Sequence, residues 1–592
     1  FAESNKKQTY VLHKALSKEN SHYDYDNALI IFSLGASPCF VDLGDDNDAF
    51  EDYRSDFIDD VNFLSEKFEY VEKIGRKKHW LKSFKYQSVK DLNLDALILD
   101  GPSEKRFVDL LTSLVIGSIN DVTKINLEPK NILDSVKSKI ILFDTDQTSF
   151  VFRSGRNKRY VIQGLAGSGK TELLLHKMKE IYSNEQEAKI AFTCFNKILA
   201  SSMRNRIPTF FDFMRVDRQI DWDKKLFCFH AWGSTSKHAS GMYRYICHFY
   251  NIPFGTLQAG SFDMLCKRAI KEISEKPLEN NFAFDYSFID ESQDFADSFI
   301  DLCELVTEKK VFIAGDVFQN IFRAIDVSVS KADLVLRKCY RTDPKNLMFS
   351  HALGMGLFET PILRWLKDHE WAACGYDYTE SNNRATVMRD SLSRFEDIPD
   401  NYECTKIHQV ESLETICDSI IKVIADIKVR NETVCQGDIA VLFLDKMNYI
   451  YNVIPELENK IYEQFGWEVN ISFRTKTSNS DKLFISNINN AKGLEFPFVI
   501  CFALELKKHK SFRNALYTMM ARSFLESHLI VNNNEETAMM SDINAGLQFL
   551  NPTPRLIAKL VNRMSSIIAD NEYSDSEIYA ILEIEYKRNL KL

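Results

Sequence analysis

The sequence contains little that suits a metal cluster, a membrane span or a secretion signal. It has 12 cysteines in 592 residues, yet no two of them form the CxxC pair that zinc ribbons and iron–sulfur motifs use. No stretch approaches the roughly 18 uninterrupted apolar residues of a membrane helix. The first residues, FAESNKKQTY, lack the apolar core of a signal peptide. We therefore expect buried thiols in a reducing compartment, no membrane partner and a cytoplasmic protein.

The sequence also lacks an excess of positive charge. It has 74 Lys+Arg against 84 Asp+Glu, which gives a formal net charge of −10 and a pI near 5.8. This balance excludes a surface coated with basic residues, but it leaves room for a local basic groove. The hydrophobic content of 45% and the charged content of 27% are ordinary for a globular protein, so a disordered chain and a small disulfide scaffold are excluded as well.

Residues 1–140 carry few recognisable signals and an excess of acidic charge. This region has 19 Lys+Arg against 24 Asp+Glu. Residues 28–32 and 38–43 have the apolar pattern of short strands, and residues 45–60 have the spacing of an acidic amphipathic helix. A basic stretch follows that contains Trp80 and Phe84, and its cations are Lys73, Arg76, Lys77, Lys78, Lys82 and Lys85. We expect an N-terminal α/β accessory domain, in which the basic stretch is either a solvated helix face or a contact with nucleic acid or a partner.

The strongest signal in the chain is a phosphate-binding loop. An apolar strand, residues 160–163, leads into a GxxxxGK[ST] sequence, and the amphipathic stretch ELLLHKMKEIY follows it. The glycines of the loop are Gly164, Gly167 and Gly169. Glycines let the backbone N–H groups and the helix N-terminus face an anion. Lys170 would neutralise the β- and γ-phosphates and Thr171 would bind Mg²⁺, so the pattern predicts a site for a nucleoside triphosphate.

A second strand, residues 286–289, ends in two acidic residues. Asp290 can bind the Mg²⁺ and Glu291 can polarise the attacking water, which is the division of roles that phosphoryl transfer to water requires. The next apolar strand, residues 311–316, is followed by Gln319, which is placed to sense a γ-phosphate. These segments predict an ATPase of the P-loop type.

Over residues 141–535 the sequence resembles the UvrD/Rep-type superfamily 1 helicases, because eight segments follow one another in the family's order. The segments are Asp144–Gln147, Phe192–Lys197, Phe227–Trp232, Asp290–Asp294, Gly315–Phe322, Cys339–Arg341, Ala491–Phe496 and Leu516–Ser523, and the P-loop lies between the first two. The resemblance implies two RecA-like P-loop NTPase domains with parallel sheets, residues 141–325 and 326–545, followed by C-terminal helices in residues 546–592. It also implies an ATP- and Mg²⁺-dependent translocase or helicase that moves 3′→5′ on single-stranded or partly duplex DNA.

The same resemblance assigns roles to individual residues. Catalysis falls to Lys170, Glu291, Gln319, Arg341 and Arg522, the two arginines meeting the charge of the transition state. Gln147 would recognise adenine, Tyr340 would stack on the base and Glu495 would coordinate the ribose. DNA would be contacted by Phe195, Asn196, Lys197, His230, Trp232 and Phe322. For His230 two roles remain open: it either packs within the protein or contacts DNA.

The sequence departs from the family pattern at several positions. Ala521, Cys228 and Phe322 each lack a hydroxyl that the family usually has there, so we expect the coupling to DNA to be altered. The intervals from Lys170 to Asp290 and from Arg341 to Lys492 are short, which predicts reduced 1B and 2B insertions and a compact motor.

Two other functions remain open at this stage. The translocase could act in bacterial DNA repair or phage defence. An ATP-gated sensor or scaffold could instead dock a partner such as a nuclease through residues 1–140, because compact helicases with extra N-terminal domains occur in bacterial phage-defence systems. A nuclease could instead lie within residues 1–140, with Asp42, Glu51 and the pair Glu72/Lys73 as its metal site. RNA in place of DNA is also compatible with the sequence.

Overall fold

The contacts of the chain divide it into two compact units, Phe1–Arg153 with Thr209–Arg218 (unit 1) and Ser154–Pro208 with Gln219–Leu592 (unit 2). The computed structural model describes residues 8–13, 16, 23–116, 125–126, 128–139, 142–153, 155, 157–214, 216, 218–275, 281–316, 332–339, 342–359, 362–381, 384–389, 395, 398–444, 450–475, 479–487, 491–532, 537–550 and 555–559. Within that part of the chain, none of the helices combines the length and the apolarity needed to cross a bilayer.

Unit 1 is built on a mixed four-stranded sheet with the order β1-β2-β3-β4. Its strands are β1 (Thr9–Leu12), β2 (Ala28–Ser33), β3 (Ala36–Asp42) and β4 (Lys85–Ser88). The pairs β1/β2 and β2/β3 are antiparallel, whereas β3/β4 is parallel. Because β4 is last in the strand order, it is an edge strand. The predicted strands at 28–32 and 38–43 are therefore confirmed as β2 and β3.

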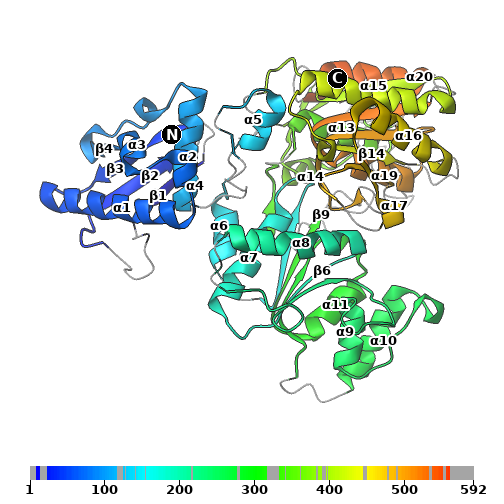
Figure 1. Ribbon diagram of the computed structural model, residues 1–592, viewed down its shortest axis with the longest axis horizontal. Helices are drawn as coiled ribbons and strands as arrows, with labels where there is room; N and C mark the ends of the chain where they lie inside the picture. The colour runs from blue at the N-terminus through cyan, green and yellow to red at the C-terminus, as the bar shows by residue number, and fades with distance from the viewer. Residues whose placement is uncertain are drawn as a thin grey trace, which may run out of the picture. The chain divides into compact units, whose positions relative to one another are not determined.

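Two long helices share the main core of unit 1 with this sheet, α1 (Asn47–Lys67) and α4 (Pro102–Ile116), as Figure 1 shows. The acidic helix expected at 45–60 is confirmed as α1, which begins after Asp46, whose carboxylate accepts a hydrogen bond from Ala49 N at 3.1 Å. The buried side chains of α1 recur at helical spacing; they are Phe50, Tyr53, Phe57, Ile58, Val61 and Ser65.

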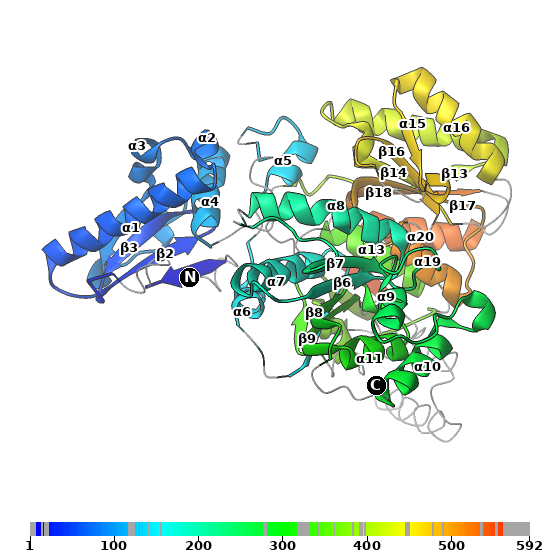
Figure 2. The same cartoon turned by 60° about the horizontal axis from the view of Figure 1, so that its bottom comes forward.

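Unit 2 contains two six-stranded sheets in which every strand pair is parallel. The first has the order β10-β5-β9-β8-β6-β7. Its strands are β5 (Arg159–Gly164), β6 (Ile190–Cys194), β7 (Leu226–His230), β8 (Phe284–Ile289), β9 (Thr307–Asp316) and β10 (Leu334–Leu336). Its helices are α7 (Lys170–Asn184), α8 (Lys197–Phe213), α9 (Met242–Phe249), α10 (Phe262–Ser274) and α11 (Asp297–Leu305), of which α9, α10 and α11 share one apolar core with the sheet (Figure 2).

The second parallel sheet has the order β13-β18-β17-β14-β16-β15. Its strands are β13 (Thr405–Val410), β14 (Ile439–Phe443), β15 (Val469–Ile471), β16 (Leu483–Asn487), β17 (Phe496–Ala503) and β18 (Ser523–Asn532). Its main helices are α13 (Pro344–Met355), α15 (Ile416–Arg430), α16 (Ile450–Phe465), α19 (Lys510–Met520) and α20 (Thr537–Leu550). Two parallel sheets beside a mixed N-terminal sheet confirm the predicted fold class of two RecA-like domains with an α/β accessory domain.

Two local features differ from the sequence expectation. Strand β10 pairs with β5, so the first parallel sheet extends past residue 325, where the first domain was expected to end. Residues 555–559 lie in the segment expected to hold C-terminal helices, but they form strand β19 (Arg555–Lys559). β19 completes a small antiparallel sheet with β11 (Asp377–Ser381) and β12 (Arg384–Met388). The hydrogen bonds of β19 with β12 outweigh the weak helical pattern of its five residues. Residues 546–550 of the predicted C-terminal helical segment form the end of α20, and, apart from β19, the remainder of that segment lies outside the described residues.

All twelve cysteines lie in described residues, and all of them are free thiols. Every one is buried except Cys435, which is exposed. The sequence expectation of buried, unpaired thiols therefore holds at each position but that one.

Candidate nucleotide-binding site

The loop between β5 and α7 has the backbone geometry that a phosphate cradle requires. Gly167 and Gly169 have φ angles of 73° and 91°, a region that residues with a side chain rarely adopt. A Cβ atom on Gly167 would also lie 2.3 Å from Thr342 Oγ1. The loop then passes directly into α7, whose first residue is Lys170. The chain thus turns so that backbone N–H groups at the start of α7 face the loop interior.

Lys170 is buried in this loop, and its hydrogen bonds go to neutral backbone carbonyl groups. Its Nζ donates to the carbonyl oxygens of Gly164 at 3.0 Å and Leu165 at 2.7 Å. Among the described residues it pairs with no carboxylate. A buried ammonium without an anionic partner is costly, and a phosphate oxygen would supply that partner. The loop therefore fits a triphosphate.

The hydroxyl of Thr171 and the carboxylate of Asp290 meet at the edge of the loop. Thr171 Oγ1 donates to Asp290 Oδ2 at 2.8 Å, and Asp290 is only 1% exposed. Burial, together with the charge of Glu291, raises the pKa of Asp290 to about 6. A divalent cation would stabilise the ionised carboxylate at this position, and hydroxyl and carboxylate oxygens are ligands that Mg²⁺ accepts. Thr171 and Asp290 therefore fit the Mg²⁺ site predicted for them.

Glu291 is held in a strained position next to Asp290. Its φ of 53° places it in the left-handed region, which costs a residue with a side chain about 1 kcal/mol or more. Gln293 Nε2 donates to Glu291 Oε2, while Gln293 Oε1 accepts a hydrogen bond from Asp316 N at 2.8 Å. Gln293 thus ties the carboxylate to the end of β9, a role that sequence reasoning did not assign. The available signal was its spacing of two residues after Glu291 in a tight turn.

The two parallel sheets of unit 2 both contribute to the pocket around the loop. A cavity of about 210 Å³ is lined by Lys170, Thr171 and Glu291 from the first sheet and by Glu495 and Arg522 from the second. Arg522 is buried, and its Nε donates to Thr518 O at 2.9 Å. Gly167 and Gly169 of the loop also line it, so the structure brings seven of the predicted site residues around one cavity.

An ion pair joins the same two sheets beside the cavity. Lys492 Nζ pairs with Asp294 Oδ1, across 198 residues of sequence. Burial raises the pKa of Asp294, and the neighbouring Lys492 ammonium opposes that shift. Arg206 also lines the cavity and pairs with Glu172, and nothing in the sequence pattern singled it out.

Several predicted nucleotide residues are not tested by this geometry. Gln319, Phe322, Tyr340 and Arg341 lie outside the described residues. Gln147 belongs to unit 1, where it is buried and its Oε1 accepts a hydrogen bond from Asp144 N at 3.0 Å. Its Nε2 has no hydrogen-bond partner within the described part of the chain. Its role as the adenine-recognising residue stays a prediction.

The predicted DNA residues of β6 and α8 lie at the carboxyl end of the first sheet. Phe195 is 46% exposed, and its ring meets the edge of Phe295 at 5.6 Å. Asn196 Oδ1 accepts a hydrogen bond from Leu199 N at 2.7 Å, so Asn196 caps α8, which begins at Lys197. Phe195 and Lys197 are therefore available to a strand, whereas Asn196 already has a local structural role.

His230 and Trp232 make contacts within the protein. His230 Nε2 accepts a hydrogen bond from Gly233 N at 3.1 Å, and burial, with a smaller effect of Lys197, lowers its pKa to about 4. Trp232 Nε1 donates to Gly255 O at 3.1 Å, and its ring lies 4.8 Å from that of Phe262. This geometry favours the packing role for His230, and DNA contact by either residue stays a prediction.

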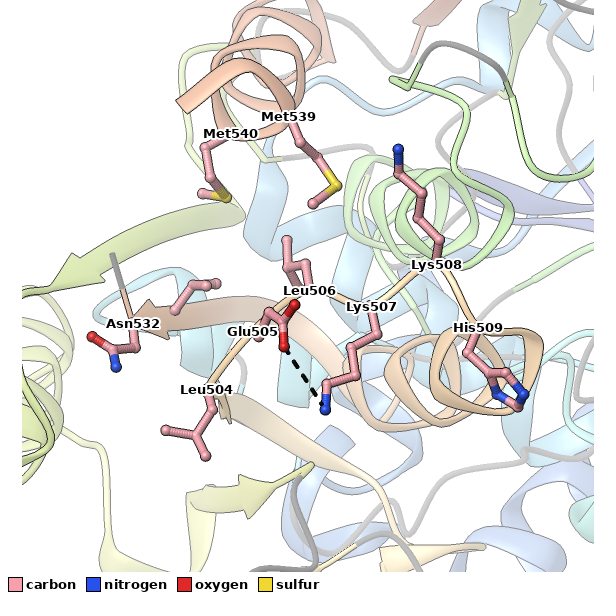
Figure 3. Close-up of a pocket in the computed structure, with 10 residues that line it drawn as sticks. Leu504, Glu505, Leu506, Lys507, Lys508, His509, Asn532, Met539 and Met540 are labelled. Carbon is pink, nitrogen blue, oxygen red and sulfur yellow. Dashed lines mark ion pairs between the residues drawn. The ribbon is translucent and has the colours of Figure 1, made fainter. Parts of the chain in front are cut away.

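A second pocket lies at the carboxyl ends of β17 and β18 and was not foreseen (Figure 3). It has a volume of about 560 Å³ and combines the apolar side chains of Leu506, Met539 and Met540 with Lys507 and Lys508. Lys507 Nζ lies 3.8 Å from Glu505 Oε2, whereas Lys508 has no ion-pair partner in the described part of the chain. The signal that could have revealed it is the basic run KKHK at residues 507–510, shortly after β17.

The carboxylates considered for a nuclease in unit 1 have separate partners. Asp42 Oδ1 accepts hydrogen bonds from Tyr25 OH at 2.9 Å and from Gly44 N at 3.0 Å. Glu51 pairs with Arg54 on α1, and Lys73 Nζ donates to Ile125 O at 3.0 Å. The described residues contain no group of three or more side chains that could hold a metal ion.

Comparison with known proteins identifies two domains. An AAA domain matches residues 147–324, which include the P-loop and Asp290, and a UvrD-like helicase C-terminal domain matches residues 482–530, which include Glu495 and Arg522. No curated protein matches the chain. Among solved structures, the C-terminal domain of a possible DNA helicase from Lactobacillus plantarum WCFS1 is 16% identical over 24% of this chain and 83% of that chain, with a TM-score of 0.19. The chain therefore contains an AAA domain and a UvrD-like helicase C-terminal domain, and this pair supports the resemblance to the UvrD-like helicases of superfamily 1 that the sequence motifs indicate.

Proposed function

We propose that the chain hydrolyses ATP with Mg²⁺ and uses the reaction to move 3′→5′ along single-stranded DNA. The observation that carries this proposal is the single cavity lined by Lys170, Glu291 and Arg522 from two parallel sheets. A nucleotide bound there touches both sheets, so its hydrolysis changes the contacts between them. Translocation, more than unwinding, suits a motor whose two insertions are short in sequence.

The described residues divide the work of hydrolysis among them. The P-loop and Lys170 hold the β- and γ-phosphates, and Thr171 and Asp290 would hold Mg²⁺, which supplies positive charge to the leaving phosphate oxygens. Glu291, oriented by Gln293, accepts a hydrogen bond from the attacking water. Arg522 meets the charge that develops on the transferred group, a contribution of about 10³–10⁵ in rate in related phosphoryl transfers.

The single strand is held by backbone charge and by ring stacking. Phe195 supplies an exposed ring on the first sheet, and Lys197 follows it at the start of α8. On the second sheet, Lys507 and Lys508 stand at the rim of the pocket of Figure 3. Cations and exposed rings of this kind bind a strand without reading its sequence.

The test is the ATPase rate with single-stranded DNA, duplex DNA, RNA and no nucleic acid. Lys170→Ala serves as the blank, because it removes the buried cation of the P-loop. Stimulation by single-stranded DNA is expected. A rate that does not respond to single-stranded DNA would refute the motor, and stimulation by RNA alone would replace DNA as the substrate.

A second candidate function is an ATP-gated scaffold that docks a basic partner, such as a nuclease, through unit 1 in bacterial repair or phage defence. The observation that favours it is the row of exposed carboxylates on α1, where burial and the neighbouring Asp52 raise the pKa of Asp56. Copurification of a stoichiometric partner that is lost on Asp52→Asn/Asp56→Asn would support it. An unchanged yield of that partner would exclude docking through α1.

A further inference from the structure

Residues 76–90 of unit 1, here called the basic segment, concentrate positive charge in an acidic chain. The segment has no Asp or Glu, and its cations are Arg76, Lys77, Lys78, Lys82, Lys85 and Lys90. It runs through a short helix, α3 (Lys77–Trp80), a 3₁₀ turn and the edge strand β4. The cations therefore lie on consecutive elements of one surface region.

Buried aromatic side chains hold the basic segment in a fixed conformation. Trp80 is fully buried in the core of unit 1, and the ring of Phe84 lies 5.8 Å from Trp80 and 5.7 Å from Phe40. Strand β4 is also paired in parallel with β3. Because Trp80 and Phe84 pack in the core of unit 1, they fix the backbone of the segment, and most of its charged side chains lie at the surface.

Most of these cations have no anionic partner. Lys77 pairs with Asp59, but Arg76, Lys78, Lys82 and Lys90 form no ion pair with any of the described residues. Carboxylates outnumber cations in the chain as a whole, with 84 Asp+Glu against 74 Lys+Arg. A run of unneutralised cations in that setting creates a local positive potential that attracts a polyanion.

The placement of the rings indicates which polyanion fits. Proteins that hold single strands stack the bases on exposed aromatic rings. Trp80 and Phe84 are turned inward, and the exposed ring of Tyr86, at 65% exposure, has the Arg54 guanidinium 4.6 Å from its centre. The basic segment therefore offers cations for phosphates and little surface for bases, which matches the backbone of a duplex.

We propose that the basic segment binds the phosphate backbone of duplex DNA without regard to sequence. The proposal rests on DNA being the substrate of the proposed motor, and it gives unit 1 a task that the short insertions of the motor leave open. Unit 1 would then bind duplex DNA in the same chain whose motor moves on a single strand.

The test compares two pairs of lysines in the full-length chain. Lys78→Ala/Lys82→Ala removes two charges from the basic segment, and Lys67→Ala/Lys130→Ala removes two exposed lysines elsewhere in unit 1. Fluorescence anisotropy measures binding to a blunt hairpin of about 20 base pairs and to a single strand of equal length over a range of salt concentrations. For the first variant, the slope of log K against log salt on duplex should be about 1.8 less steep, and Kd at low salt about tenfold higher.

The control variant should keep the wild-type slope, and both variants should keep wild-type binding of the single strand and its stimulation of ATPase. An unchanged duplex slope, or an equal loss in the control variant, would overturn the proposal. Failure of the motor is distinguishable, because wild-type protein would then show no ATPase stimulation by single-stranded DNA while the duplex slopes still differed.

Discussion

The raised pKa of Asp290 predicts that Mg²⁺ binding weakens as the pH falls. Burial and Glu291 raise that pKa to about 6, so Asp290 is almost fully ionised at pH 8 and about one quarter ionised at pH 5.5. Mg²⁺ binds the ionised form, so its affinity for the enzyme–nucleotide complex should fall about fourfold over this range. Thr171, whose hydroxyl donates to Asp290, does not titrate and adds nothing to the change.

The assay is a Mg²⁺ titration of fluorescent-nucleotide binding at each pH, with Asp290→Asn as the matched control. The nucleotide's own phosphate also takes up a proton near pH 6, and that contribution is common to both proteins. The Asp290→Asn protein should therefore bind Mg²⁺ more weakly at every pH. Between pH 8 and pH 5.5 its Mg²⁺ affinity should lack the fall of about fourfold that the ionisation of Asp290 adds in the wild type. Identical pH dependence in the two proteins would show that Asp290 is not the titrating ligand, and the assigned Mg²⁺ site would be wrong.

Three further substitutions test other parts of unit 2. Gln293→Met keeps the side-chain volume but loses the hydrogen bonds to Glu291 and Asp316 N. It should lower kcat about 10- to 100-fold, with a smaller change in KM for ATP. If steady-state kinetics showed a change in KM alone, Gln293 would have a structural role and would not orient Glu291. Phe195→Ala should weaken single-strand binding about tenfold in an anisotropy titration, because it removes an exposed ring, and an unchanged Kd would remove Phe195 from the strand path. Glu526→Gln should lower the free energy of unfolding by about 3 kcal/mol in urea, because the buried Glu526 carboxylate accepts hydrogen bonds from Arg430 at 2.6 and 2.8 Å. A urea midpoint equal to that of the wild type would show that the Arg430–Glu526 ion pair is not a net stabiliser.

The parts of the site that the sequence predicted are those with local signals. The P-loop and Asp290–Glu291 each follow an apolar strand, and the local pattern of glycines and acids is the site itself. Strands β2 and β3 of unit 1 and helix α1 were predictable for the same reason, because their apolar pattern is contained within a few residues, whereas β1 and β4 were not predicted.

The contacts that the sequence did not predict join segments that are distant in the chain. Lys492 meets Asp294 across 198 residues, and Gln293 bridges the turn after β8 to the end of β9. Strand β19 was expected within a helical segment, and only its pairing with β12 decides its conformation. Such contacts depend on how the sheets are assembled, so no pattern of neighbouring residues encodes them.

The left-handed backbone of Glu291 has a consequence for efforts to engineer this protein. A glycine at that position would relieve the strain at a φ of 53°, and it would also remove the negative charge that lies beside the buried Asp290 carboxylate. Selection of a variant library for thermal stability alone would therefore enrich Glu291→Gly, and the selected proteins would be more stable but inactive. Stabilising this enzyme requires that selection for turnover accompany selection for melting temperature, because at this residue the two properties oppose each other.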